Sequence, residues 1–218
     1  MAGFILRLIK LNTGLFLYAL GIVFTIKANI GYAPWEVFHI GVSIAAGLSL
    51  GTVVILTGAA IVVITFLMGE KIGLGTLLNM VIIGIFIDII LCIKSIPVIT
   101  SWIAGIFVLI AGLFIIAFAS FLYIGSGMGS GPRDSLMVAL TRKTGLPVGL
   151  CRGAIELAAV IIGWLLGGMV GAGTIISAFA IGLCIQVTFK LLKFRPADIQ
   201  HEDLSETFRN LFDGQSHE

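Results

Sequence analysis

Charge is scarce in this sequence of 218 residues, because Asp, Glu, Lys and Arg together make up only 11% of it. A soluble domain carries about 25% charged residues. Hydrophobic residues make up 59%, and the mean hydropathy is +1.16. A soluble fold of this size cannot bury so much apolar surface, so we expect a lipid bilayer as the solvent. The net charge of +2 gives no reason to expect nucleic acid as a partner.

Cysteine is also rare, and several catalytic motifs are absent. Cys92, Cys151 and Cys184 all lie in apolar runs, and their odd number argues against a disulfide framework. We expect them to be small apolar filler. The Cys/His spacing of a metal site is missing, as are the Walker A, HExxH and GxSxG motifs. We therefore expect no metal, no cofactor and no enzymatic activity.

Long apolar runs are what the sequence has instead. A spanning helix needs about 20 mostly apolar residues, and six stretches approach or exceed this length: 4–27, 51–68, 73–93, 100–124, 149–166 and 172–192. Within the first stretch, Arg7 and Lys10 precede the apolar run Leu11–Ile26, an order of charge that resembles a signal peptide. It is too long for one and lacks a cleavage site, so we expect it to be retained.

Two further segments, 34–46 and 132–144, have helical character but are too short to cross comfortably. Each begins at a proline suited to the first helical turn and ends before a glycine suited to a cap, Gly47 or Gly145. The expected fold is therefore an all-α polytopic membrane protein, with six long transmembrane helices and two short broken or re-entrant helices.

Lys and Arg near the ends of the spans predict the orientation. Arg7 and Lys10 lie at one terminus, and Lys190, Lys193 and Arg195 lie near the other. We expect a multi-pass protein of the bacterial cytoplasmic membrane with both termini in the cytoplasm. Six crossings satisfy this if the short helices re-enter, and eight satisfy it if they span.

An internal repeat emerges when the chain is shifted by 98 residues, which aligns 31–88 with 129–186 without a gap. The two windows hold nine and eleven glycines, which would coincide at about two positions by chance. They coincide at seven, and Pro34 matches Pro132. The sequence thus divides into a first membrane repeat at 1–98, a second at 99–195 and a cytoplasmic tail at 196–218.

Broken segments at matching positions of a repeat are the usual sign of a transporter's binding site, because irregular backbone at membrane depth must be buried or line a cavity. The alternative is that the breaks only help a small bundle to pack. Three crossings in each half would make the halves inverted, which we favour, whereas four would make them parallel. In the tail, Leu204, Phe208, Leu211 and Phe212 recur at helical spacing, which predicts a short amphipathic helix or, alternatively, a frayed end.

The second half carries a family resemblance. Its residues include Gly-Ser-Gly-Pro-Arg-Asp at 129–134, Gly145, Gly149, Arg152, Glu156 and Gly171-x-Gly173-Thr174. With these motifs the chain resembles the YczE/YyaS/YitT-like integral membrane proteins of bacteria, and the first half carries the counterpart Gly31-Tyr-Ala-Pro-Trp-Glu. Members are described as uncharacterised or as candidate transporters, so the resemblance implies a membrane protein without an assigned substrate.

Ionisable groups inside apolar segments are costly and are therefore candidates for function. We predict a substrate site at the starts of the two short helices, formed by Trp35, Glu36, His39, Arg133 and Asp134. The two helix N-termini and Arg133 would attract an anionic group, with Trp35 as an apolar wall. Four other polar residues of the spans are candidates for coupling or intramembrane charge: Asp88, Arg152, Glu156 and Gln186.

A structural explanation exists for several of these residues. Arg152 and Glu156, four apart on a helix, suit an ion pair, and Arg133 with Asp134 suits a helix cap. Asp88 is harder to explain by packing, because its counterpart in the repeat, Gln186, is neutral.

The leading hypothesis is a secondary transporter of a small polar or organic solute. An anionic solute and coupling to protons are further parts of this hypothesis. The alternative is a membrane scaffold or regulatory protein without transport activity, in which the tail would dock partners. The glycine-rich faces also suit a homodimer.

Overall fold

The computed structural model describes residues 2–93, 96–199, 202–204, 206–207 and 209, and within these ranges all regular structure is helical. The eight α-helices are α1 (Ala2–Lys27), α2 (Pro34–Ala46), α3 (Leu50–Leu67), α4 (Leu74–Ile93), α5 (Trp102–Ile124), α6 (Pro132–Thr144), α7 (Val148–Leu165) and α8 (Ala172–Leu191). A 3-10 turn follows at Pro196–Asp198. All but α2 and α6 are long and apolar enough to cross a membrane, which confirms the predicted fold class.

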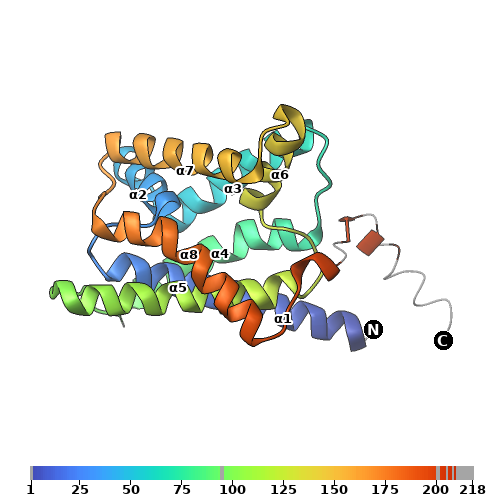
Figure 1. Cartoon of the computed structure of the whole chain (residues 1–218), viewed down its shortest axis with the longest axis horizontal. Coiled ribbons are helices and arrows are strands. Elements are labelled where there is room, and N and C mark those ends of the chain that lie inside the picture. Colours follow the sequence, from blue (N-terminus) through green and yellow to red (C-terminus); the bar gives the residue numbers. More distant parts are fainter. Residues whose placement is uncertain (1, 94–95, 200–201, 205, 208, 210–218) are drawn as a thin grey trace.

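Helices α1 and α5 lie side by side along one edge of the bundle, where α4 packs against α1 and α8 packs against α5 (Figure 1). They are antiparallel, because Gly14 in the middle of α1 lies against Ala119 near the end of α5, while Gly105 near the start of α5 lies against Ala28, just beyond the end of α1. With α3 and α4 as the spans between them, α1 and α5 run in opposite directions only if α2 does not cross. The antiparallel pair therefore favours six crossings and inverted halves over eight crossings and parallel halves.

The breaks before the short helices are held by hydrogen bonds between the two halves of the chain. The Gly75 N–H donates to the Met128 carbonyl over 2.6 Å, and the Gly173 N–H donates to the Ile30 carbonyl over 2.7 Å. Both the donors and the acceptors of these two bonds are 98 residues apart. This correspondence supports the predicted repeat and shows why the loop glycines are needed, since backbone meets backbone there.

The short helices have the bounds that proline and glycine predict. α2 and α6 each begin at proline and end at a left-handed glycine, Gly47 (φ 66°) and Gly145 (φ 69°). α2 packs against α7, and α6 packs against α3. Figure 1 shows them in opposite halves of the molecule, each extending from the middle toward one end.

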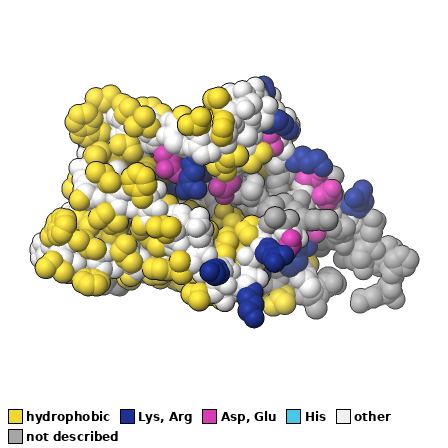
Figure 2. All heavy atoms as spheres, in the orientation of Figure 1, with side chains coloured by type: hydrophobic (Ala, Val, Ile, Leu, Met, Phe, Trp, Pro, Cys, Tyr) yellow, Lys and Arg dark blue, Asp and Glu magenta, His cyan; other side chains and the backbone are white. Residues whose placement is uncertain are grey.

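Both described ends of the chain lie at the same end of the bundle, where Lys and Arg side chains gather (Figures 1 and 2). The described part of the tail is anchored there, because Glu202 pairs with Arg7 at 2.8 Å and Asp203 pairs with Lys71 at 2.9 Å. The hydrogen bond and charge of Asp203 raise the pKa of Lys71 above its usual range. Of the predicted amphipathic helix, Leu204 is described, whereas Phe208, Leu211 and Phe212 lie outside the described residues.

The cysteines divide into two groups. Cys151 and Cys184 are buried, as expected of apolar filler, but Cys92 is exposed, and all three are free thiols. Burial of Cys92 would require a neighbour on its face of α4, and the described helices leave that face uncovered.

Candidate binding pocket

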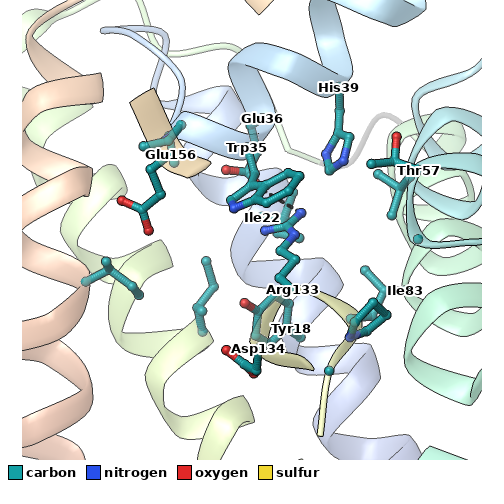
Figure 3. A pocket seen from close by; sticks show the side chains of 18 of the residues that line it. Tyr18, Ile22, Trp35, Glu36, His39, Thr57, Ile83, Arg133, Asp134 and Glu156 are labelled. Carbon is teal, nitrogen blue, oxygen red and sulfur yellow. Dashed lines mark ion pairs between the residues drawn. The ribbon is translucent and has the colours of Figure 1, made fainter. Parts of the chain in front are cut away.

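A cavity of about 170 Å³ lies in the middle of the bundle, and every one of the eight helices contributes to its wall. The first residues of α2 and α6 face into it together, as Figure 3 shows for Trp35, Glu36, Arg133 and Asp134. The N-cap residues of the two short helices, Ala33 and Gly131, make no side-chain cap hydrogen bond within the described residues. Unsatisfied backbone N–H groups and the positive ends of two helix dipoles therefore meet at one cavity, which favours an anionic group.

Arg133 links the two short helices across the cavity. Its guanidinium lies 4.7 Å from the centre of the Trp35 ring and 3.8 Å from the nearest carboxylate oxygen of Glu36 (Figure 3). A separation of 3.8 Å is too long for a hydrogen bond. Among the described residues Arg133 donates no hydrogen bond, so its N–H groups are available to a ligand.

The two acids at the helix starts differ in their surroundings. The Glu36 side chain is buried, with 6% of its residue surface exposed, and Arg133 is its nearest cation. Asp134 is exposed and accepts a hydrogen bond of 2.9 Å from the Tyr123 hydroxyl. The pair Arg133–Asp134 is therefore not an isolated helix cap, because each side chain is engaged by another helix.

His39 and Ser177 add buried polar atoms to the wall. His39 is 2% exposed and stacks at a tilt on Trp35, with ring centres 5.9 Å apart. Ser177, on α8, is 1% exposed, and its hydroxyl has no hydrogen-bond partner in the part of the chain that the structure describes. A buried hydroxyl without a partner costs free energy. Its position in the cavity wall suits a hydrogen bond to water or to a bound solute.

Arg152 and Glu156 form the predicted ion pair on α7, with 2.8 Å between the Arg152 Nε and the carboxylate. Both residues line the cavity on the side where α7 faces α8. Figure 2 shows charged side chains at a hollow in the middle of this face, flanked by apolar surface. The Arg152 side chain is 46% exposed and that of Glu156 is 20% exposed, so the pair lies at the edge of the cavity rather than inside a closed core.

All five residues of the predicted substrate site line this cavity, together with Arg152 and Glu156. Asp88 and Gln186 do not. The Asp88 carboxylate instead accepts hydrogen bonds from the Gly51 N–H (2.7 Å) and the Ser49 hydroxyl (2.5 Å), which join α4 to the start of α3. Gln186 is exposed on α8.

Sequence reasoning missed Tyr18, Tyr123, Asn79 and Ser177, which also line the cavity. Tyr18 and Tyr123 make an edge-to-face contact with ring centres 6.1 Å apart. A weak signal for them exists, because the whole chain has only three tyrosines and two of these lie inside long apolar runs. Asn79 and Ser177 occupy equivalent positions of the repeat, 98 residues apart.

The charged groups of the cavity form no metal cluster. Within the described ranges, no three side chains of His, Cys, Asp or Glu come close enough together to hold a metal ion. The cavity offers instead a guanidinium, carboxylates, hydroxyls and an indole ring, which are groups suited to binding a small polar organic molecule.

The fold and the cavity define a polytopic α-helical membrane protein with a polar pocket between two broken segments. The chain belongs to the family of unknown function DUF6198, whose model matches residues 5–190. It is 38% identical over 175 residues to the uncharacterized membrane protein YczE of Bacillus subtilis, covering 79% of this chain and 80% of that protein.

Two further relatives are also bacterial. An uncharacterized protein of Haemophilus influenzae is 30% identical over 171 residues, 78% of each chain. The uncharacterized protein YyaS of Bacillus subtilis is 22% identical over 183 residues, covering 83% of this chain and 90% of that protein. No solved structure matches the chain. These relatives agree with the resemblance to YczE-like membrane proteins that the sequence motifs indicate.

Proposed function

We propose that this protein is a secondary transporter of a small polar organic solute, with the central cavity as its binding site. The observation that carries the proposal is the meeting of two uncapped helix N-termini at one cavity, with Arg133 between them. Transporters with inverted halves place their sites at the middle of the bilayer, where broken helices meet. A scaffold has no need for a polar cavity at this depth, where unpaired polar groups are costly.

The charges of the cavity suggest the chemistry of the solute. Arg133 and the two helix N-termini suit a carboxylate or a phosphate, and Trp35 offers an apolar surface beside it. Glu36, 3.8 Å from the same guanidinium, and Asp134, in the wall of the same cavity, suit a positively charged group of the same molecule. The cavity volume of about 170 Å³ restricts the solute to a small one. A compact zwitterion or organic anion fits these conditions.

Proton coupling is part of the proposal. Glu36 is a buried carboxyl group whose partner Arg133 is held only loosely. Such a group can take up a proton when a solute or a conformational change draws the arginine away, because burial disfavours an unpaired charge. Coupled transport would then respond to a pH gradient across the membrane.

Ligand binding is the first test of the site. We expect a thermal-shift screen of small organic acids and amino acids on the purified protein to give a hit that Arg133→Ala and Glu36→Gln both abolish. A ligand at 100 times its Kd adds about 2.7 kcal/mol to the stability of the folded state. Flux of the hit into proteoliposomes, with and without a pH gradient, then tests transport and coupling separately.

Arg142 supplies a matched control, because it also lies on α6 and pairs with a glutamate, Glu70, at 3.0 Å, outside the cavity. Arg142→Ala should leave the hit unchanged. Hits that survive both cavity substitutions would move the site elsewhere. A hit that binds without flux would favour the non-transporting alternative.

The orientation proposed is that of a protein in the bacterial cytoplasmic membrane with both termini in the cytoplasm. Basic residues at the end that carries the termini include Arg7, Lys10, Lys71, Arg142, Lys143, Lys190, Lys193 and Arg195. At the other end, the described residues include Lys27. Positive loops stay in the cytoplasm, so this asymmetry supports the orientation.

Single cysteines in the two turns that follow the short helices check both orientation and inversion. Leu48 and Leu146 are exposed and lie at equivalent positions of the repeat. In a chain freed of its native cysteines, an impermeant maleimide should label Leu48→Cys from outside the cell and Leu146→Cys only after the membrane is opened. Labelling of both from the same side would mean that the halves are parallel and that the short helices span.

A further inference from the structure

Helices α3 and α4 are packed tightly at the end of the bundle opposite the termini. Gly51, in the first turn of α3, touches the backbone of Gly84 on α4, and a side chain at Gly84 would meet the Gly51 carbonyl at 2.6 Å. Asp88 completes this contact by accepting hydrogen bonds from the Gly51 N–H and the Ser49 hydroxyl. The contact leaves no room for a side chain between α3 and α4 at this point.

The equivalent helices of the second half are apart. Gly149 and Gly182 are the counterparts of Gly51 and Gly84, 98 residues further along the chain. A side chain built on either of them would meet nothing within 4 Å. α7 and α8 hardly touch, and Figure 1 shows them diverging toward the end that carries the termini. The difference in burial falls on one helix of each pair, since 39% of the α3 span but 17% of the α7 span is buried, whereas the α4 and α8 spans are each 22% buried.

The facing residues of α7 and α8 are complementary nevertheless. On the first pair of helices, Gly58 faces the long side chain of Met80. At the equivalent positions of the second pair, the long side chain is Glu156 and its small counterpart is Ala178. Each pair therefore combines one small residue with one long one, so the same close packing is sterically available to α7 and α8.

Gln186 occupies the position equivalent to Asp88. Its amide oxygen is an acceptor, as the Asp88 carboxylate is, and the N–H group of Gly149 in the first turn of α7 has no partner inside its own helix. If α7 and α8 came together, Gln186 would be placed to accept from Gly149, just as Asp88 accepts from Gly51.

We propose that α7 and α8 form a gate, which closes when Gly149 meets Gly182 and Gln186 accepts the Gly149 N–H. The structure is then the state in which the cavity is closed at the α3–α4 end and open between α7 and α8, toward the termini. The role of this gate, to admit or release a solute, rests on the proposed transport function. Its geometry rests only on the contacts above.

The inverted arrangement of the two halves explains how such a gate would work. When two halves have the same packing surfaces, exchanging their conformations turns a cavity open at one end into a cavity open at the other. The observed state has one pair of helices in contact and the equivalent pair apart. The opposite state would have Gly51 and Gly84 apart and Gly149 and Gly182 in contact.

Disulfide trapping tests the gate without any solute. In a chain with Cys92, Cys151 and Cys184 replaced by serine, Gly149→Cys and Gly182→Cys are introduced together. A disulfide forms when the two Cα atoms come within about 4.4–6.8 Å. It therefore captures the approach of α7 and α8 before the full glycine contact, which leaves no room for side chains in the equivalent α3–α4 pair. Because oxidation is cumulative, it also captures a closed state that is visited rarely. We expect copper phenanthroline in proteoliposomes to remove both thiols of this variant, measured by maleimide labelling and mass spectrometry.

Two control pairs of cysteines accompany the test, one expected to stay reduced and one expected to be oxidised. Leu150→Cys with Leu183→Cys lies one residue further along on each helix, both positions are exposed, and this pair should keep its thiols. Ser49→Cys with Asp88→Cys replaces two side chains already in contact and should be oxidised at once. The new side chains at 149 and 182 meet open space, so the test variant should fold, as its melting temperature will show.

Retention of both thiols in the Gly149/Gly182 variant, with the Ser49/Asp88 pair oxidised, would overturn the gate and make the α7–α8 gap a permanent feature. Oxidation at the same rate as the Leu150/Leu183 pair would overturn it as well. Disulfide formation in the Gly149/Gly182 variant, together with no measurable solute flux in the parent protein, would contradict the transport proposal alone. The two ideas can therefore fail independently.

Discussion

Arg133→Ala is expected to destabilise the folded protein more than removal of any other basic side chain among the described residues. Glu36 is 6% exposed, and Arg133 is its nearest cation, at 3.8 Å. Removing one partner of a buried ion pair leaves a carboxylate that must either stay uncompensated or take up a proton, which costs roughly 3 kcal/mol or more. The loss of the contact between Arg133 and the Trp35 ring adds about 1 kcal/mol. Thermal unfolding in detergent measures the effect as a lower melting temperature.

The double variant Arg133→Ala with Glu36→Gln identifies the cause. If the cost comes from the charge left on Glu36, neutralising that residue should restore most of the lost stability. Arg142→Ala is the matched control, since the Arg142 side chain is 54% exposed against 29% for Arg133, and the Glu70 side chain is 16% exposed against 8% for Glu36. It should cost about 1 kcal/mol or less. Equal losses from Arg133→Ala and Arg142→Ala would mean that Arg133 is not held electrostatically.

The helices could be predicted from the sequence because their boundaries are marked by local chemistry. Proline fixes the first turn of α2 and α6, and Gly47 and Gly145 supply the left-handed caps, so both short helices have the predicted bounds. No local sequence feature distinguished inverted from parallel halves. The basic residues Arg142 and Lys143 are expected on the cytoplasmic side with either six or eight crossings. The distinction required the contacts between α1 and α5, which no local pattern encodes.

The candidate site was predictable only in part, for a similar reason. Residues at the starts of the short helices could be placed in one cavity because the repeat brings the two breaks together. Asp88 and Gln186 differ, since whether they face the cavity or the neighbouring helix depends on how α4 and α8 pack. Tyr18 and Tyr123 lie outside the aligned windows, and only the antiparallel packing of α1 and α5 brings them to the cavity.

Gly31→Ala and Gly129→Ala are expected to prevent stable folding. Both glycines have positive φ angles, 114° and 123°, which side chains of L-residues rarely adopt. Both also meet the backbone of the other half. A side chain at Gly31 would lie 2.7 Å from the Gly171 nitrogen, and one at Gly129 would lie 2.9 Å from the Gly73 Cα atom. Strain and overlap together should cost roughly 4 kcal/mol or more, seen as loss of the monodisperse peak in size-exclusion chromatography.

Two sets of control glycines separate strain from contact. Gly47→Ala and Gly145→Ala keep a positive φ but meet nothing within 4 Å, so backbone strain alone should cost about 1–2 kcal/mol. Gly149→Ala and Gly182→Ala lie within helices and meet open space, so they should gain up to about 1 kcal/mol from helix propensity.

The order of stability among these three groups of glycine variants tests how much the contacts between the two halves contribute. If the halves are held together through their breaks, the Gly31 and Gly129 variants must be far less stable than the Gly47 and Gly145 variants, although all four share a positive φ. Similar losses in both sets would mean that the backbone contacts with Gly171 and Gly73 contribute little. The hydrogen bonds from Gly75 and Gly173 could not then be what fixes the short helices around the cavity.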